Sequence, residues 1–187
     1  LGPQAYRFVD WLASTGCKLW QILPLGPTGY GDSPYQCFSA FAGNPYLISF
    51  DALIEDGLLT QDDFVDMPTF DASRVDFGLL IPWKLDLLLK AFSRFGDSEG
   101  PLRAEFNYFC AENVSWLDDY ALFMSLKEAN GGGAWNEWDE SIRKRKKTAM
   151  TKARKEHAED IQRYSFYQFL FYRQWNRLRA YANERNI

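Results

Sequence analysis

The chain has 187 residues, of which 47% are hydrophobic and 17% aromatic, so it is long enough for one domain with a buried core. Its formal net charge of −4 argues against a general nucleic-acid-binding protein, which is normally basic. The single histidine excludes a histidine-rich metal site, and three cysteines without a CxxC pair indicate reduced thiols in a cytoplasmic protein.

The first 25 residues predict a helix and a strand. Residues 3–15 carry apolar side chains at helical spacing, with Pro3 in the first turn and Gly16 as the C-terminal stop. The apolar run Lys18–Leu23 then ends at Pro24 and predicts a strand. Helix, glycine turn and strand together are typical of an α/β unit. No apolar run in the chain approaches the ~20 residues of a membrane-spanning helix.

The segment from Gly26 to Tyr46 predicts a long ordered loop, because it is dense in glycine and proline yet rich in aromatic residues. Long ordered loops often carry function. Tyr30 and Tyr35 offer flat faces, and Ser33 and Asn44 offer short polar groups. A sugar uses both, since its hydroxyls need hydrogen-bond partners and its C–H faces lie against rings. The residues alone leave open a second interpretation, in which the tyrosines only pack the loop.

The rest of the chain predicts mainly helices: Leu79–Phe92, Val114–Ala129 and Thr151–Asn183. The glycine run Gly131–Gly133 is expected to stop the second of these helices. The third has an aromatic-rich half, Ile161–Leu178, which predicts docking against a large surface outside this chain.

Two long stretches resemble a known family. They are WQILPLGPTGYGDSPYQ from Trp20 and FSAFAGNPYLIS from Phe38, and shorter matches begin at Arg74, Trp116 and Phe169. These stretches resemble the amylomaltases, which are 4-alpha-glucanotransferases of glycoside hydrolase family 77. The form of the loop around Ser-Pro-Tyr is similar to that of the bacterial enzymes rather than the plant plastid ones.

The resemblance implies an α/β fold, namely the N-terminal portion of a (β/α)8 TIM barrel with a mostly helical inserted subdomain. Residues 1–25 would be a barrel helix and strand, and residues 26–150 a loop and helical insertion lining the glucan cleft. Residues 151–187 would be a long helix that returns to the barrel. The first barrel strand is expected before Leu1 and the third after Ile187.

The resemblance also implies an activity. The enzyme would transfer a segment of an α-1,4-glucan to the 4-hydroxyl of an acceptor glucose or maltooligosaccharide, by a retaining double displacement without a cofactor. Its partners would be these glucans and the remainder of the same polypeptide, with no nucleic acid and no membrane. The catalytic aspartate, glutamate and second aspartate of the family lie beyond Ile187. This chain therefore holds no catalytic residue, and alone it is expected to be inactive and poorly folded.

Four substrate-binding residues are predicted in the loop. By resemblance, Tyr35 and Ser33 line the donor side of the cleft, and Tyr30 belongs to a second glucan site found in some members. That second site also uses an aromatic residue where this chain has Ile81, so its flat face is missing here. Asn44 is predicted as a further polar contact.

The other candidate residues are expected to be structural. Asp118 and Asp119 are adjacent on a helix and point to different faces, so they do not predict a catalytic pair. The charged surroundings of His157 and the basic run Arg143–Lys147 predict solvated helix surfaces. A second function class stays open at this point: a non-catalytic helical module that binds glucan or another protein. A reading frame continuing into further barrel strands would decide between the two.

Overall fold

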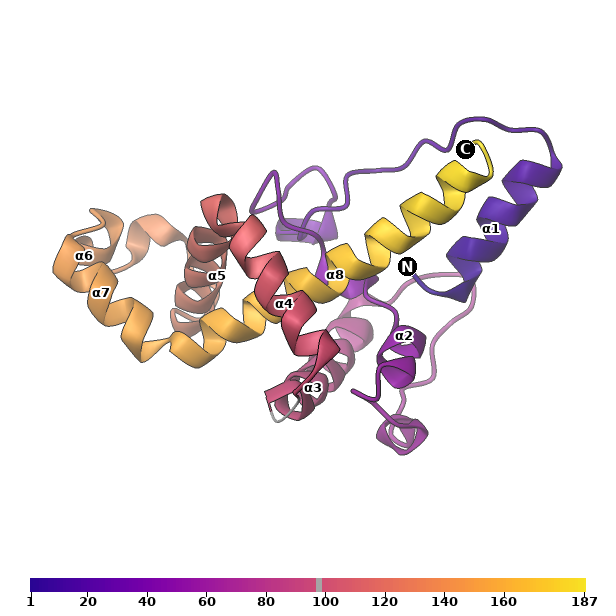
Figure 1. Ribbon diagram of the computed structural model, residues 1–187. Coiled ribbons are helices and arrows are strands. Elements are labelled where there is room, and N and C mark those ends of the chain that lie inside the picture. Colours follow the sequence, from indigo (N-terminus) through magenta and orange to yellow (C-terminus); the bar gives the residue numbers. More distant parts are fainter. Residues whose placement is uncertain (97–98) are drawn as a thin grey trace.

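The computed structural model describes residues 1–96 and 99–187 and, at Tyr30, the backbone alone. The described chain is helical and elongated (Figure 1). Its α-helices are α1 Pro3–Ser14, α2 Phe50–Glu55, α3 Phe77–Gly96, α4 Pro101–Glu112, α5 Val114–Ala129, α6 Glu140–Arg143, α7 Lys147–Glu156 and α8 Ala158–Glu184. Four short 3₁₀ helices join them: η1 Tyr30–Asp32, η2 Pro45–Leu47, η3 Gln61–Phe64 and η4 Trp135–Glu137.

Glycine ends two of the predicted helices, which confirms both expected stops. After α1, Gly16 has a φ of 76°, and the next residue, Cys17, donates its N–H to the Leu12 carbonyl over 3.1 Å. After α5, Gly132 has a φ of 78° and its N–H reaches the Lys127 carbonyl over 2.8 Å. A residue in the left-handed conformation at this position turns the chain back, so that backbone N–H groups beyond the helix donate to carbonyls that have no partner within it.

Helix α8 runs through the middle of the molecule and contacts α1, α3, α4, α5 and α7 (Figure 1). Its aromatic face is buried inside this chain: Phe166, Phe169 and Leu170 are 0%, 3% and 1% exposed. The ring of Phe166 stacks on Phe95 of α3 with centroids 4.5 Å apart, and Phe106 of α4 joins the same cluster.

The prediction that this face waits for a surface outside the chain is therefore wrong for these residues. The reason is that α3 and α4 supply their own apolar faces, which sequence periodicity cannot assign to a particular partner. The expectation that the chain alone is poorly folded rested on this face being uncovered, so it loses its basis.

The predicted helix Thr151–Asn183 is broken at His157, which is a second correction. His157 has φ −106° and ψ 24°, ends α7 and precedes α8. Side chains on both sides of the break, Ala153 and Ile161, pack into one apolar cluster with Leu122 and Trp138. The break thus lies between two side chains that pack against the same cluster, a contact that helical periodicity alone does not predict.

The predicted strand Lys18–Leu23 is also not formed. Between residues 1–96 and 99–187 the structure holds one isolated bridge, Thr28 with Cys37, and no strand. Residues 17–25 form an irregular segment in which Leu19 is 88% exposed. A strand needs a neighbour that accepts its N–H groups, and the described chain offers none beside this segment.

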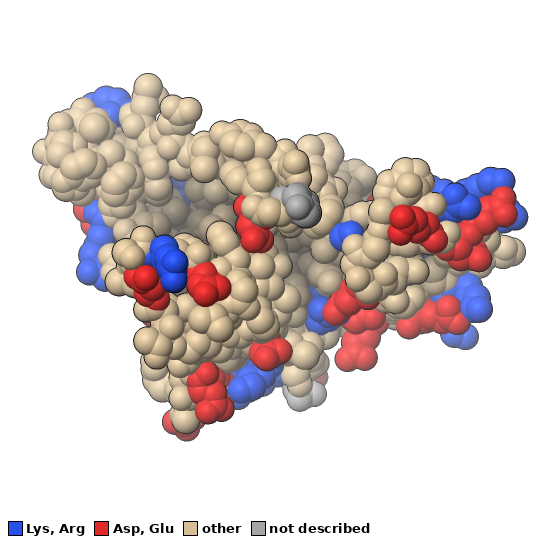
Figure 2. Space-filling view, turned by 180° about the vertical axis from the view of Figure 1, so that it is seen from behind, with Lys and Arg blue, Asp and Glu red and all other residues tan. Residues whose placement is uncertain are grey.

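Charged side chains gather at the end of the molecule that holds α6 and α7, and much of the remaining surface in the same view is uncharged (Figure 2). Several large apolar side chains are exposed near the N-terminus, among them Phe8, Trp11 and Leu23. None of the described helices is long and apolar enough to cross a lipid bilayer.

Candidate functional site

The predicted loop contains a short hairpin, with residues 30–35 at its tip. At its base Gly29 donates its N–H to the Gln36 carbonyl over 2.7 Å, and Phe38 donates to the Pro27 carbonyl over 3.3 Å. Thr28 and Cys37 form the bridge between the two arms. The tip therefore has a defined backbone path even though it is dense in glycine and proline.

Tyr35 and Ser33 lie together at the tip of this hairpin. The backbone N–H of Tyr35 donates to Ser33 Oγ over 3.3 Å, and the Gln36 N–H donates to the Ser33 carbonyl over 3.1 Å. Pro34 fixes its own φ and restricts Ser33 to an extended backbone, which Ser33 adopts with φ −72° and ψ 128°. Tyr35 is 72% exposed in the described chain, so its side chain is open to solvent.

The other two predicted residues are placed differently. The backbone of Tyr30 starts η1, while its side chain lies outside the part that the structure describes. Asn44 is 9% exposed, and its Oδ1 accepts the Tyr46 N–H over 2.8 Å, so it caps η2. Its N–H also donates to the Leu25 carbonyl over 2.7 Å. Asn44 thus holds the loop, and its contact with a sugar stays a prediction.

Two glutamines of α8 clamp the loop backbone, and sequence reasoning missed both. Gln168 accepts the Gly43 N–H over 2.7 Å and donates to the Gly43 carbonyl over 2.9 Å. Gln174, six residues later, accepts the Ser49 N–H over 2.7 Å and donates to the Ser49 carbonyl over 3.1 Å. Each amide thereby satisfies both polar groups of a buried residue, as a neighbouring strand would. The signal that could have found them is a glutamine among the aromatic residues of the helix face predicted to be buried.

The loop also approaches α8 closely at Gly43. A Cβ built on Gly43 would lie 2.0 Å from the ring of Phe171, so only glycine fits there. Beside it, the Tyr172 hydroxyl donates to the Phe41 carbonyl. The part of the loop that follows the hairpin therefore packs directly on α8.

Lys84 supports the end of the loop from α3. Its Nζ donates to the Ile48 carbonyl over 2.7 Å and lies 4.1 Å from the centre of the Phe50 ring. Burial disfavours the charged ammonium and lowers the pKa of Lys84 to about 8.

Aromatic side chains extend from the loop onto α5. Phe41, which is exposed, stacks on Trp116 with ring centroids 6.2 Å apart. Phe38 lies at the same centroid distance from Phe123. The arm of the loop that follows Tyr35 thus carries aromatic faces that pack on α5.

The acidic residues take structural roles. Asp119 forms ion pairs with Arg145 and Arg154, each at 2.9 Å, which is a structural role. In the described ranges no group of three or more potential ligand side chains could hold a metal ion.

The comparison of the sequence with known families extends over the whole chain. The model of glycoside hydrolase family 77, described as 4-alpha-glucanotransferase, matches residues 1–187. The chain belongs to this family.

Relatives with the same name come from bacteria and plants. The 4-alpha-glucanotransferase of Thermus thermophilus is 47% identical over 188 residues, covering 100% of this chain and 37% of that enzyme. The one from Synechocystis is 44% identical with the same two coverages. The chloroplastic/amyloplastic enzyme of Arabidopsis thaliana is 38% identical and is covered to 32% of its length.

A solved structure matches the fold of this family member. It is the amylomaltase from Streptococcus agalactiae in complex with acarbose, with a TM-score of 0.93 and 40% sequence identity. The match covers 100% of this chain and 38% of the amylomaltase chain. The chain therefore spans a little over a third of the length of the relatives that it matches.

Proposed function

We propose that residues 1–187 are the N-terminal part of a 4-alpha-glucanotransferase. The enzyme transfers a segment of an α-1,4-glucan to the 4-hydroxyl of an acceptor glucose or maltooligosaccharide by a retaining double displacement. The observation that carries this proposal is the family match over every residue of the chain, joined to a hairpin that presents an exposed tyrosine. The free thiols of all three cysteines support a cytoplasmic location.

The remainder of the polypeptide completes a TIM barrel in this proposal. The relatives continue well beyond the matched part, which favours an enzyme over a self-contained binding module. The exposed side chains of Trp11, Leu19 and Leu23 would be covered in the complete protein, and Lys18–Leu23 would pair as a barrel strand there. The catalytic carboxylates belong to that remainder.

In the proposed enzyme Tyr35 contacts the donor glucan, with Ser33 beside it and Asn44 holding the loop at its base. The support is the 72% exposure of Tyr35 on a backbone that is fixed at both ends. Tyr30 is proposed as a contact at a separate site, where Ile81 in α3 offers no aromatic face.

The test is kinetic and uses the full-length enzyme with maltotriose as donor and acceptor. We expect Tyr35→Ala to lower kcat/KM by roughly 10- to 100-fold, or about 1.4–2.8 kcal/mol of transition-state stabilisation. Tyr35→Phe keeps the ring and removes the hydroxyl, so it separates the contributions of the two groups to kcat/KM. Tyr108→Ala is the matched control, because Tyr108 of α4 is 68% exposed and lies outside the loop. Wild-type kcat/KM in a folded Tyr35→Ala enzyme would end the proposed role of Tyr35.

A further inference from the structure

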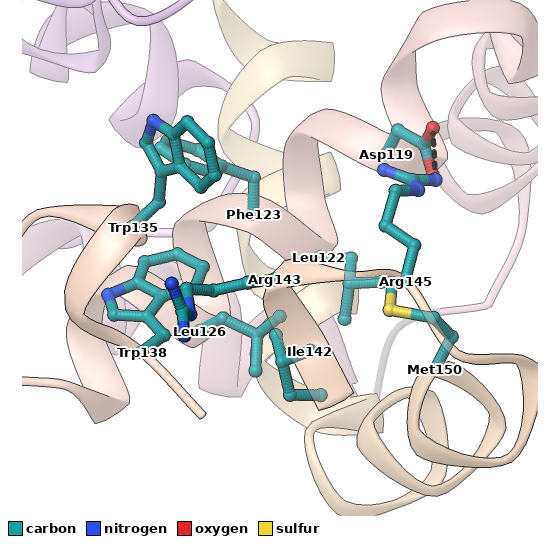
Figure 3. A pocket seen from close by; sticks show the side chains of 10 residues that line it. All are labelled: Asp119, Leu122, Phe123, Leu126, Trp135, Trp138, Ile142, Arg143, Arg145 and Met150. Atoms are coloured by element: carbon teal, nitrogen blue, oxygen red, sulfur yellow. Dashed lines mark hydrogen bonds and ion pairs between the residues drawn. The ribbon is translucent and has the colours of Figure 1, made fainter. Parts of the chain in front are cut away.

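A pocket of about 440 Å³ lies between α5, η4, α6 and the start of α7 (Figure 3). Its volume is within the range of roughly 300–1,000 Å³ that is typical of ligand pockets. Aliphatic side chains of α5, α6 and α7 form part of its wall. In Figure 3 the rings of Phe123, Trp135 and Trp138 gather at one end, and Asp119 and Arg145 lie at the other.

The two tryptophans differ in how they are held. Trp138 is buried, its Nε1 donates to the Gly133 carbonyl over 3.3 Å, and its ring lies 5.5 Å from that of Phe123. Trp135 is 59% exposed although an apolar pocket lies beside it. The pocket thus combines a fixed aromatic wall with an indole face that is open to solvent.

The charged residues of the pocket supply both donors and acceptors. Arg145 binds both carboxylate oxygens of Asp119, at 2.9 and 3.1 Å, so the carboxylate is fixed in place. Arg143 lines the same pocket and is exposed. A purely apolar partner would take this ion pair and the exposed Arg143 guanidinium out of water, which costs free energy, and an anion would face the carboxylate of Asp119. A neutral ligand with many hydroxyl groups suits guanidinium donors and a carboxylate acceptor together.

The pocket is connected to the hairpin that carries Tyr35. Phe123, which lines the pocket, also lies next to Phe38 of the hairpin, with ring centroids 6.2 Å apart. The ammonium of Lys127 lies over the Phe38 ring at 5.0 Å from its centre. Ring contacts therefore lead from Phe38 of the loop through Phe123 of α5 to Trp138.

We propose that this pocket is an additional α-glucan-binding site, in which a glucose unit stacks on Trp135 and its hydroxyls pair with Arg143, Arg145 and Asp119. The proposal rests on the proposed function, because the loop and the pocket would bind parts of the same long glucan. Linking two sites through one chain raises the effective concentration at the second site. A short donor engages the sites one at a time and gains nothing from the pocket.

The experiment compares a long and a short substrate in the full-length enzyme. We expect Trp135→Ala to raise KM for amylose about 3- to 10-fold, the loss of one stacking face, and to leave kcat/KM for maltotriose within about twofold of wild type. Trp135→Phe keeps a flat ring and should restore most of the affinity for amylose. Tyr108→Ala removes a similarly exposed ring from α4 and should leave both KM for amylose and kcat/KM for maltotriose unchanged. A thermal melt of each variant shows whether it is folded.

Affinity electrophoresis in native gels containing amylopectin gives a second readout that needs no turnover. Trp135→Ala should be less retarded than wild type and Tyr108→Ala equally retarded. Equal retardation and equal KM for amylose in the Trp135→Ala and wild-type enzymes would overturn the site, as would equal losses with amylose and maltotriose. A wild-type enzyme that shows Trp135-dependent retardation without any transfer activity would instead contradict the proposed function and leave the site intact.

Discussion

We expect replacement of Gln168 by leucine to lower the free energy of unfolding by about 2–6 kcal/mol. Gln168 is 1% exposed, and it is the partner of both backbone polar groups of Gly43, at 2.7 and 2.9 Å. Leucine fills a similar volume but pairs with neither group. Each buried group left unpaired costs about 1–3 kcal/mol, which gives the stated range. This loss is large beside a typical domain stability of about 5–15 kcal/mol.

The assay is urea unfolding of the 187-residue chain, followed by tryptophan fluorescence and by circular dichroism. Gln162→Leu is the matched control, since Gln162 is an exposed residue of the same helix and should change stability by no more than about 0.5 kcal/mol. The two variants should unfold with the same dependence on urea as the wild type. If Gln168→Leu is no less stable than Gln162→Leu, the loop is not held by this side chain and the reasoning is refuted.

Three further predictions concern the loop contacts and the activity of the chain. Gly43→Ala should destabilise by about 3 kcal/mol in urea unfolding because its Cβ would overlap the Phe171 ring, whereas Gly96→Ala, with open space around it, should not destabilise. Lys84→Met should become less stable relative to wild type as pH rises. Between the folded pKa of about 8 and the ordinary lysine pKa of 10.5 the unfolded chain binds more protons, so wild type gains about 2 kcal/mol from about pH 7 to about pH 10. The 187-residue chain incubated with maltotriose should form neither glucose nor longer maltodextrins, and sustained turnover by pure protein would contradict the assignment of the catalytic acids to the remainder of the enzyme.

The sequence predicted the helices best where their ends carry local signals. The bounds of α5 coincide with the expected Val114–Ala129, and glycines end α1 and α5 as expected. A left-handed residue at a helix end is a local property, so it can be read from the chain alone. The break at His157 carries no glycine or proline, and for this reason it was not predicted.

The sequence by itself also indicated the family and placed Tyr35 in an ordered loop, while its exposure became visible only in the structure. Only the tertiary structure decided what holds that loop: the pairing of Gln168 with Gly43 and of Gln174 with Ser49 joins residues 125 positions apart. It likewise decided that the aromatic face of α8 packs on α3 and α4, and that Lys18–Leu23 finds no partner strand. Helix ends follow from a few neighbouring residues, whereas a buried partner depends on which distant segments meet, and periodicity gives the face of a helix without naming what covers it.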